Sequence, residues 1–224
     1  MAAFDVIRRA GANLGSPEEE LQAYGPQQWL AHAWSSLVRG AASARHGFHV
    51  GQLASIAADG APQVRTVVLR EVSVEARQLL CHTDRRSGKC AELAAAPRVA
   101  WHFYDARRKL QLRLHGRAEV HVEGVLWARR WQASSLGSRR CYLTTDAPGT
   151  PQNAWDSGFP APLRERRPEL AESEAGRANF AVVATTIERL DLLWLSARGH
   201  RRLRFAWSPA APGGGRWDGG WVTP

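Results

Sequence analysis

Residues 110–122, with the sequence LQLRLHGRAEVHV, alternate apolar and polar side chains more clearly than any other part of the chain. In an extended chain the apolar positions share one side: Leu110, Leu112, Leu114 and Ala118. The polar positions share the other side: Gln111, Arg113, His115 and Arg117. This period of two predicts a strand with one face in the core and one face in water, as in many antiparallel sheets.

The same period recurs on both sides of this segment. The segments before it predict strands at residues 50–56, 63–70, 78–82 and 99–104. The segments after it predict strands at residues 180–186, 190–195 and 201–207 and a short C-terminal segment at 217–222. Because most of these strands follow one another without an intervening helix, they favour an antiparallel barrel or sandwich over βαβ winding.

Three segments show helical spacing instead. Residues 25–44 carry Pro26 at the first helical position, residues 87–96 are stopped by Pro97, and residues 123–136 follow the central strand. We therefore predict a mainly β fold with flanking helices (α+β), formed by residues 1–224 as a single domain. Residues 1–25 are expected to be a flexible arm, and the proline-rich residues 144–178 a long loop.

Composition excludes several classes of protein. The chain has 224 residues, of which 44% are hydrophobic and 23% charged, so it is neither fibrous nor wholly disordered. Three cysteines without a CxxC spacing argue against a disulfide framework and favour a reducing, cytoplasmic compartment. No signal peptide and no apolar run of about 18 residues is present, so no membrane partner is expected.

The net charge of +9 suits an anionic partner without choosing one. Ten tryptophans and the excess of arginine keep a nucleic-acid binder as an alternative, but no helix-turn-helix or RNP-like pattern supports it. We therefore expect no nucleic-acid partner. GxGxxG, P-loop, HExxH and GxSxG motifs are absent, and isolated histidines such as His102 and His115 predict no metal site.

Four groups of residues are candidates for binding. The first, residues 65–70, is an apolar run between Arg65 and Arg70, whose odd separation would place them on opposite faces of a strand. The second runs from His82-Thr83 to Ser87-Gly88-Lys89, where a helix start could bind phosphate. Solvated strand ends and a helix cap are the simpler readings of these two groups.

The third and fourth groups lie on strands. Gln111 could donate and accept hydrogen bonds with a heterocycle on the polar face of the central strand. Trp194 is followed by His200, Arg202 and Arg204, three basic or near-basic groups that share one strand face and would suit an anion. Each group alone is equally consistent with a solvated sheet face.

Taken together and in this order, the four groups resemble the pyridoxamine 5′-phosphate oxidase family of FMN-binding split β-barrels. The resemblance covers residues 48–122 well and residues 191–224 more loosely. It implies a homodimer with FMN at the subunit interface and a small-molecule substrate. The FMN-binding residues that it implies are Arg65, Thr66, Val67, Val68, Leu69, Arg70, His82, Thr83, Ser87, Lys89, Gln111, Trp194 and Arg204. The residues expected on the substrate side are Arg70, His200 and Arg202.

The sequence also departs from the family pattern. His82 replaces a usual aromatic residue, and Gly88 stands where a basic residue is common, for which Arg86 is expected to compensate. The substrate-phosphate pattern of the oxidases is not kept in residues 131–142. We expect an FMN-dependent oxidoreductase acting on a small amine or related substrate, phosphorylated or not, with no catalytic residue assigned. A non-catalytic flavin- or haem-binding split barrel is the alternative.

Overall fold

The computed structural model describes residues 17–209 and 214–224. The strands are β1 Val50–Ile56, β2 Pro62–Val68, β3 Glu71–Ser73, β4 Gln78–Asp84, β5 Arg98–Asp105, β6 Leu110–His121, β7 Phe180–Trp194, β8 Arg201–Ser208 and β9 Arg216–Val222. The α-helices are α1 Pro17–Ala23, α2 Pro26–Ala42, α3 Gly88–Ala95, α4 Gly124–Gln132, α5 Leu136–Arg139 and α6 Leu170–Ser173. The 3₁₀ helices are η2 Arg140–Tyr142, η3 Ala161–Leu163 and η4 Glu174–Asn179.

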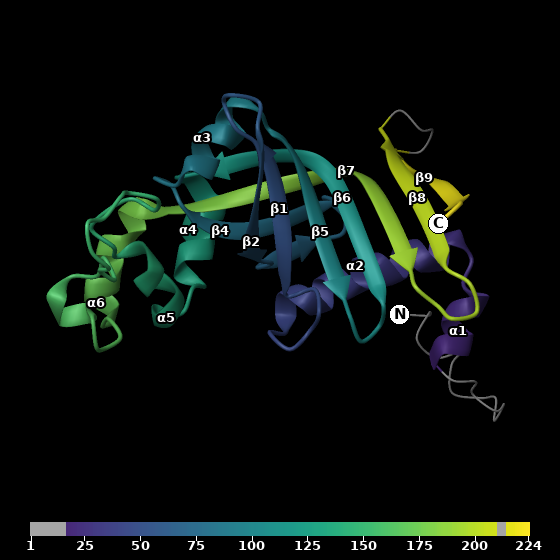
Figure 1. The fold of residues 1–224 in the computed structure, drawn as a ribbon, viewed down its shortest axis with the longest axis horizontal. Helices are drawn as coiled ribbons and strands as arrows, with labels where there is room; N and C mark the ends of the chain where they lie inside the picture. Colours follow the sequence, from purple (N-terminus) through teal and green to yellow (C-terminus); the bar gives the residue numbers. More distant parts are fainter. Residues whose placement is uncertain (1–16, 210–213) are drawn as a thin grey trace.

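These strands form one sheet in the order β2-β1-β5-β6-β7-β4-β3, and β8 and β9 extend it from β7 (Figure 1). All strand pairs within the described residues are antiparallel. The sheet curls without closing, and helices flank it. The predicted fold class is therefore confirmed.

Strand β6 is the centre of the sheet, as its alternation predicts. Leu110, Leu112 and Leu114 are buried, while the side chains between them face away from the core. At Gly116 the register with β7 shifts, and a Cβ there would lie 2.1 Å from the carbonyl oxygen of Thr186. Glycine is therefore required at this close approach of the two backbones.

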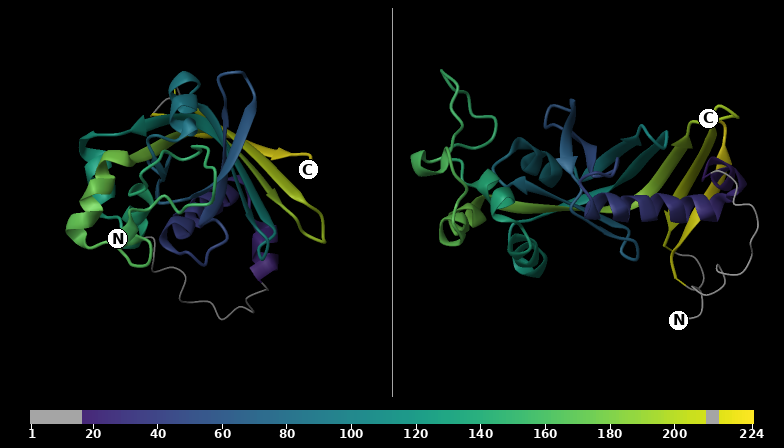
Figure 2. Two further views of the ribbon diagram at one scale, coloured as in Figure 1. Left: turned by 60° about the vertical axis from the view of Figure 1, so that its left-hand side comes forward. Right: turned by 90° about the horizontal axis from the view of Figure 1, so that it is seen from below.

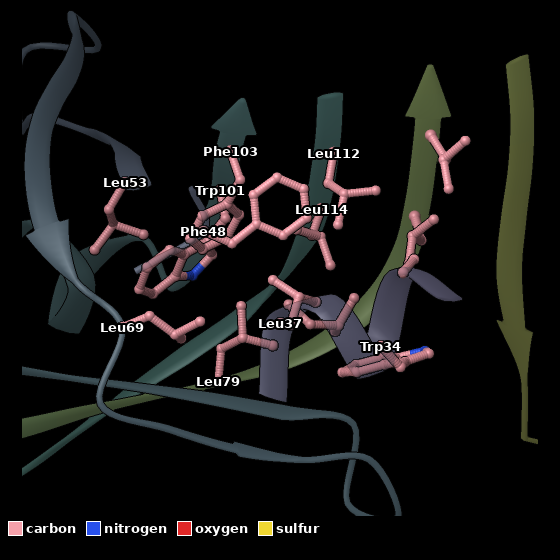
Figure 3. Close-up of a cluster of buried hydrophobic side chains, with 14 of the residues drawn as sticks. Trp34, Leu37, Phe48, Leu53, Leu69, Leu79, Trp101, Phe103, Leu112 and Leu114 are labelled. Atoms are coloured by element: carbon pink, nitrogen blue, oxygen red, sulfur yellow. The ribbon is translucent and has the colours of Figure 1, made fainter. Parts of the chain in front are cut away.

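The core lies between the concave side of the sheet and α2. Trp29, Trp34 and Leu37 project from α2, are at most 3% exposed and pack on leucines and aromatic residues of the strands (Figure 3). This burial is the main stabilising contribution, at about 25 cal/mol per Å² of apolar surface. A second, smaller cluster joins Trp131 of α4 to Phe180 at the start of β7.

Strand β7 differs from the prediction. Residues 180–186 and 190–195 were expected to be separate strands, but they form one strand of 15 residues. The strand changes partners along its length: residues 180–186 pair with β4, whereas residues 189–194 pair with β8. Strand β6 pairs with both halves and holds them in one line.

The two ends of the molecule carry the less regular segments. Helix α1 and the β8–β9 hairpin lie at one end, and α5, α6 and the segment around them lie at the other (Figure 2). Of the expected arm, residues 17–23 form α1, and residues 1–16 lie outside the described residues. Residues 144–178, expected as a long loop, contain η3, α6 and most of η4.

Candidate functional site

A cavity of about 440 Å³ opens between β2, β4 and the start of α3. It is lined by Val50, Arg65, Thr66, Val67, Val68, Arg70, His82, Lys89 and Tyr142. Seven of these nine residues belong to the first two candidate groups, which are separated along the chain by residues 71–81. The cavity therefore brings together the residues that the sequence singles out around Arg65 and Lys89.

Arg65 and Arg70 both line this cavity, which corrects the expectation that they emerge on opposite faces of one strand. The reason is that β2 ends at Val68, two residues before Arg70, so strand alternation does not extend to it. Leu69, which was expected to contact FMN, is completely buried and packs in the core.

Lys89 lines the cavity, and its ammonium contacts two buried hydroxyl groups. Its ammonium donates to Oγ1 of Thr83 at 2.8 Å and to Oγ of Ser87 at 3.1 Å. Ser87 precedes α3 as its N-cap residue and donates to the carbonyl of Asp84 at 2.7 Å. Burial lowers the pKa of Lys89. No carboxylate within the described residues pairs with this ammonium, so it is available to an anion.

Two neighbouring side chains, Glu92 and Ser55, hold Arg65 in place. Its guanidinium bonds Oε2 of Glu92 on α3 at 2.7 Å and also contacts the hydroxyl of Ser55 on β1. Both side chains of the ion pair are mostly buried, with 21% and 16% of their surfaces exposed. Arg65 therefore keeps a fixed position, but its charge is balanced by Glu92.

Arg70, His82 and Tyr142 also line the cavity. Nε of Arg70 is buried and has no hydrogen-bond partner in the described part of the chain. Burial, together with the charges of Arg130 and Arg70, lowers the pKa of His82 to about 3, so its ring is neutral. Burial raises the pKa of Tyr142, whose phenol therefore stays protonated.

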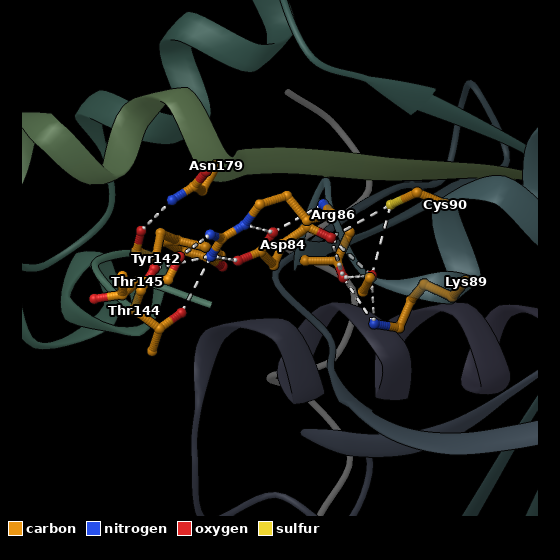
Figure 4. Close-up of polar contacts among 10 residues, drawn as sticks. Asp84, Arg86, Lys89, Cys90, Tyr142, Thr144, Thr145 and Asn179 are labelled. Atoms are coloured by element: carbon orange, nitrogen blue, oxygen red, sulfur yellow. Dashed lines mark hydrogen bonds and ion pairs between the residues drawn. The ribbon is translucent and has the colours of Figure 1, made fainter. Parts of the chain in front are cut away.

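Arg86 ties the turn before α3 to the segment that follows η2 (Figure 4). Its guanidinium donates hydrogen bonds to both carboxylate oxygens of Asp84, at 3.0 and 2.7 Å. It also donates to the carbonyls of Thr144 and Thr145 at 3.1 and 3.0 Å. Arg86 does not line the cavity, so it does not supply the basic group that was expected to compensate for Gly88.

Gln111 of the third group and Arg202 and Arg204 of the fourth lie outside this cavity, on the outer face of the sheet. Asp191 of β7 accepts hydrogen bonds from Arg113, Arg202 and Arg204 at distances between 2.6 and 3.0 Å. Burial opposes its charge, but these hydrogen bonds outweigh burial and lower the pKa of Asp191 to about 2. Arg202 and Arg204 are thus brought together, as predicted, around a carboxylate that the prediction missed.

The three remaining candidate residues lie in different places in the fold. Gln111 is half-buried on the same outer face, opposite Tyr104 of β5. Trp194 is only 4% exposed, packs on Trp29 and donates its indole N–H to the carbonyl of Arg108 at 3.2 Å. His200 is exposed in the turn before β8.

Comparison with known proteins points to one family. Residues 31–122 match the family model described as pyridoxamine 5′-phosphate oxidase, FMN-binding domain. The chain is similar to this FMN-binding family. It is 29% identical over 204 residues, 96% of the relative's length, to pyridoxine/pyridoxamine 5′-phosphate oxidase 2 of Arabidopsis thaliana. It is 37% identical over 87 residues, 43% of the relative's length, to the corresponding oxidase of Anaeromyxobacter dehalogenans.

Solved structures agree on the fold. A pyridoxamine 5′-phosphate oxidase-related, FMN-binding protein of Nostoc punctiforme superposes with a TM-score of 0.68 at 21% identity, covering 86% of this chain and 96% of the other. PhzG of Burkholderia lata, solved with tetrahydrophenazine-1-carboxylic acid, gives a TM-score of 0.60 at 18% identity over 95% of each chain. These likenesses show the split-barrel fold of the pyridoxamine 5′-phosphate oxidase family.

The residues of the cavity fit the FMN of the family. The phosphate of FMN is a dianion that needs charged donors, and the ammonium of Lys89 provides one beside the start of α3. The flavin ring needs apolar walls, which Val67 and Val68 offer. The unpartnered Nε of Arg70 marks a place where an acceptor is missing.

Sequence reasoning missed three functional candidates. Glu92 fixes Arg65, Tyr142 lines the cavity, and Asp191 gathers three arginines. Glu92 and Asp191 carry no motif, since acidic residues on a helix and a strand usually face water. Tyr142 is the last residue of residues 131–142, which depart from the family pattern, so no spacing pointed to it.

No group of three or more metal-ligating side chains occurs within residues 17–209 and 214–224. Over the same residues, no helix is both long and apolar enough to cross a membrane.

Proposed function

We propose that this chain is an FMN-dependent oxidoreductase that oxidises a small amine or related substrate, phosphorylated or not. The observation that carries the proposal is the single cavity lined by residues of two separate motifs, Arg65–Arg70 and His82–Lys89. The match of residues 31–122 to an FMN-binding domain supports FMN as the cofactor. The name of the Arabidopsis relative supports an oxidase acting on a vitamin B6 phosphate or a similar molecule.

The cofactor phosphate would bind beside Lys89, near the start of α3. Lys89 would donate directly to a phosphate oxygen, with the hydroxyls of Ser87 and Thr83 alongside it. Arg65 would present its guanidinium from the position set by Glu92. The start of α3 adds backbone N–H groups whose dipoles favour an anion.

Arg70, Arg202 and His200 are the proposed substrate-side residues. When bound, FMN supplies the two-electron acceptor for an oxidation in which an amine loses two electrons and two protons and oxygen becomes hydrogen peroxide. The protein residues orient the substrate by its charge. His82, being neutral, would limit the positive charge near the substrate.

We propose a homodimer in which FMN lies between the subunits. Gln111, Arg202 and Arg204 do not line the cavity of their own chain, so a second copy would allow them to reach a cofactor held there. Their outer sheet face carries the net positive charge of three arginines and one carboxylate. A contact from Trp194 would require its indole N–H to leave the carbonyl of Arg108.

Oxygen consumption and peroxide release by the FMN-loaded protein test this function. Pyridoxamine 5′-phosphate is the first substrate, followed by unphosphorylated pyridoxamine and a panel of primary amines. The proposal predicts peroxide in proportion to substrate consumed, with one member of the panel clearly preferred. An FMN-loaded protein that oxidises none of them would contradict the oxidase assignment and favour a binding role.

A further inference from the structure

A second pocket, of about 910 Å³, lies between the C-terminal end of α2, the segment that follows this helix and the β5–β6 turn. Its charged lining residues are Arg39, Arg45, Asp105, Arg107 and Arg108, and we call it the arginine pocket. It shares no lining residue with the cavity between β2, β4 and α3, so it is a separate place on the molecule. Its volume is in the range of pockets that hold whole small molecules.

Three of the four arginines in this pocket have no acidic partner in the described part of the chain. Arg39 donates to the hydroxyls of Ser35 and Ser36, at 3.2 and 2.9 Å, and these neutral groups leave its charge uncompensated. Arg45 and Arg107 are exposed, and their guanidinium groups make no ion pair with any described residue. All three guanidinium groups are therefore available to an anion.

Asp105 is the one acidic side chain among the described lining residues, and its oxygens are already occupied. Its Oδ2 binds the guanidinium of Arg108 at 2.6 Å. Its Oδ1 accepts the backbone N–H groups of Arg107 and Arg108 at 3.0 and 3.1 Å. Because Asp105 is only 2% exposed, it neutralises Arg108 but does not present a negative charge to the pocket.

The segment after α2 is held against the β5–β6 turn before any ligand binds. A Cβ at Gly47 would lie 2.5 Å from Cγ of Asp105, so glycine is required where the segment packs on this carboxylate. The backbone N–H of His46 donates to the carbonyl of Ser43 at 3.1 Å, and Nδ1 of His49 contacts the carbonyl of Gly40 at 2.8 Å. This fixed backbone lowers the entropic cost of binding a ligand between the two segments.

His46 supplies a second observation that points to a ligand. Its Nδ1 accepts the backbone N–H of Phe48 at 3.1 Å, so the proton of the neutral ring lies on Nε2. Burial and the charge of Arg108 lower the pKa of His46, which keeps the ring neutral at neutral pH. Nε2 is buried and has no hydrogen-bond partner within the described residues. An unpaired donor in the wall of a positively charged pocket favours a ligand rich in acceptors.

The positions of the free arginines favour an extended anion. Arg39 belongs to α2, Arg45 to the segment after it and Arg107 to the β5–β6 turn. A carboxylate or a single phosphate is one anionic group, whereas a diphosphate offers two linked phosphates to guanidinium groups on different sides. Tyr104, which is 45% exposed and also lines the pocket, adds an aromatic surface suited to the base of a nucleotide.

We propose that the arginine pocket binds a diphosphate group, either as free pyrophosphate or as part of a nucleotide. The site is distinct from the proposed flavin site, and the inference does not depend on the proposed function. It assigns a ligand to the largest group of arginines in the described structure that no carboxylate compensates.

Calorimetric titration of the FMN-loaded protein with pyrophosphate, ADP and orthophosphate, at about physiological salt, tests the proposal. Pyrophosphate is expected to bind about tenfold more tightly than orthophosphate, or better. ADP binding more tightly than pyrophosphate supports the proposal and identifies a nucleotide as the source, and the reverse order supports it with the free diphosphate as the source. Orthophosphate binding as tightly as the two diphosphates would overturn the proposal.

Variants locate the binding. R45Q and R107Q each remove one uncompensated charge and no side-chain hydrogen bond within the described residues, so they should fold like the parent and bind pyrophosphate about fivefold more weakly. The double variant R45Q/R107Q should lose more affinity than either. R98Q removes an exposed arginine at the start of β5 that does not line the pocket, and it should bind like the parent.

Two results from these variants would refute the assignment. Unchanged affinity in R45Q/R107Q would show that pyrophosphate binds elsewhere. An equal loss in R98Q would show a general attraction of anions to a basic protein. Protein that takes up no FMN is titrated in the same way, because the variants and not the cofactor locate the site. Failure of the proposed function is therefore distinguishable from failure of this inference.

Discussion

Lys89 shows how much one side chain can contribute to the site. The sequence contains only two lysines, Lys89 in the cavity and Lys109 in the exposed β5–β6 turn. The K89M substitution removes the one ammonium that faces the cavity without a carboxylate, so we expect FMN to bind about ten- to hundredfold more weakly. Quenching of flavin fluorescence measures the affinity. K109M is the matched control, and an equal loss in both variants would contradict the assignment.

His82 links the site to pH. Its pKa of about 3 in the folded protein lies below the usual 6.5, so the unfolded chain binds a proton between these values that the folded chain does not. The free energy of unfolding should therefore fall as pH falls from about 6.5 to about 3.

The H82F variant lacks this proton and should lose less stability over that range, by on the order of a few kcal/mol. Urea unfolding of variant and parent at several pH values measures the difference. Parallel curves would show that His82 is not held neutral by the fold.

At the scale of elements, Asp191 joins three strands. It lies on β7 and binds Arg113 of β6 and both Arg202 and Arg204 of β8. D191N removes the carboxylate and leaves three guanidinium groups close together, so we expect a loss of about 1–3 kcal/mol in the free energy of unfolding. D218N breaks an exposed pair with Arg216 and should cost less than about 0.5 kcal/mol. Similar losses in both variants would mean that the cluster around Asp191 stabilises the fold no more than an exposed ion pair does.

Arg86 connects the turn before α3 to the long segment after η2. R86M removes its bonds to Asp84, Thr144 and Thr145, so residues 146–178 should be cleaved faster by trypsin. R85M changes the exposed neighbouring arginine and should leave the cleavage rate unchanged. If both variants are cleaved at the rate of the parent, Arg86 does not hold the segment in place.

The sequence predicted the elements better than their connections. The alternation of residues 110–122 and the spacing of residues 25–44 correctly predicted β6 and α2, because each element buries one face in a shared core. Strand β7 was predicted as two pieces, because the polar residues between them resemble a turn. Strand β7 changes its pairing partner from β4 to β8 along its length. This change depends on tertiary packing, so no local sequence pattern predicts it.

The candidate site, like the fold, was predicted in part. The resemblance to the oxidase family placed Arg65, Arg70, His82 and Lys89 at one site, and they line one cavity. The pairing of Arg65 with Glu92 and the convergence of arginines on Asp191 depend on how separate elements pack, so they could not be predicted. Strand alternation misplaced Arg70, since the strand ends before it.

For the whole molecule, the sheet divides the proposed site into two parts. The cavity opens beside β2, β4 and α3, whereas Gln111, Arg202 and Arg204 lie on the outer face of β6 and β8. A cofactor in contact with both parts requires a second subunit. This division is the structural reason for proposing a homodimer with FMN at its interface.

The visible spectrum of the protein, recorded after incubation with FMN and removal of free flavin by gel filtration, is the most direct test of the central claim. The account predicts a yellow protein that retains about one FMN per chain, and loss of that colour in R65A and K89M. A colourless protein, or equal retention by R65A, K89M and K109M, would contradict the claim that this cavity binds FMN.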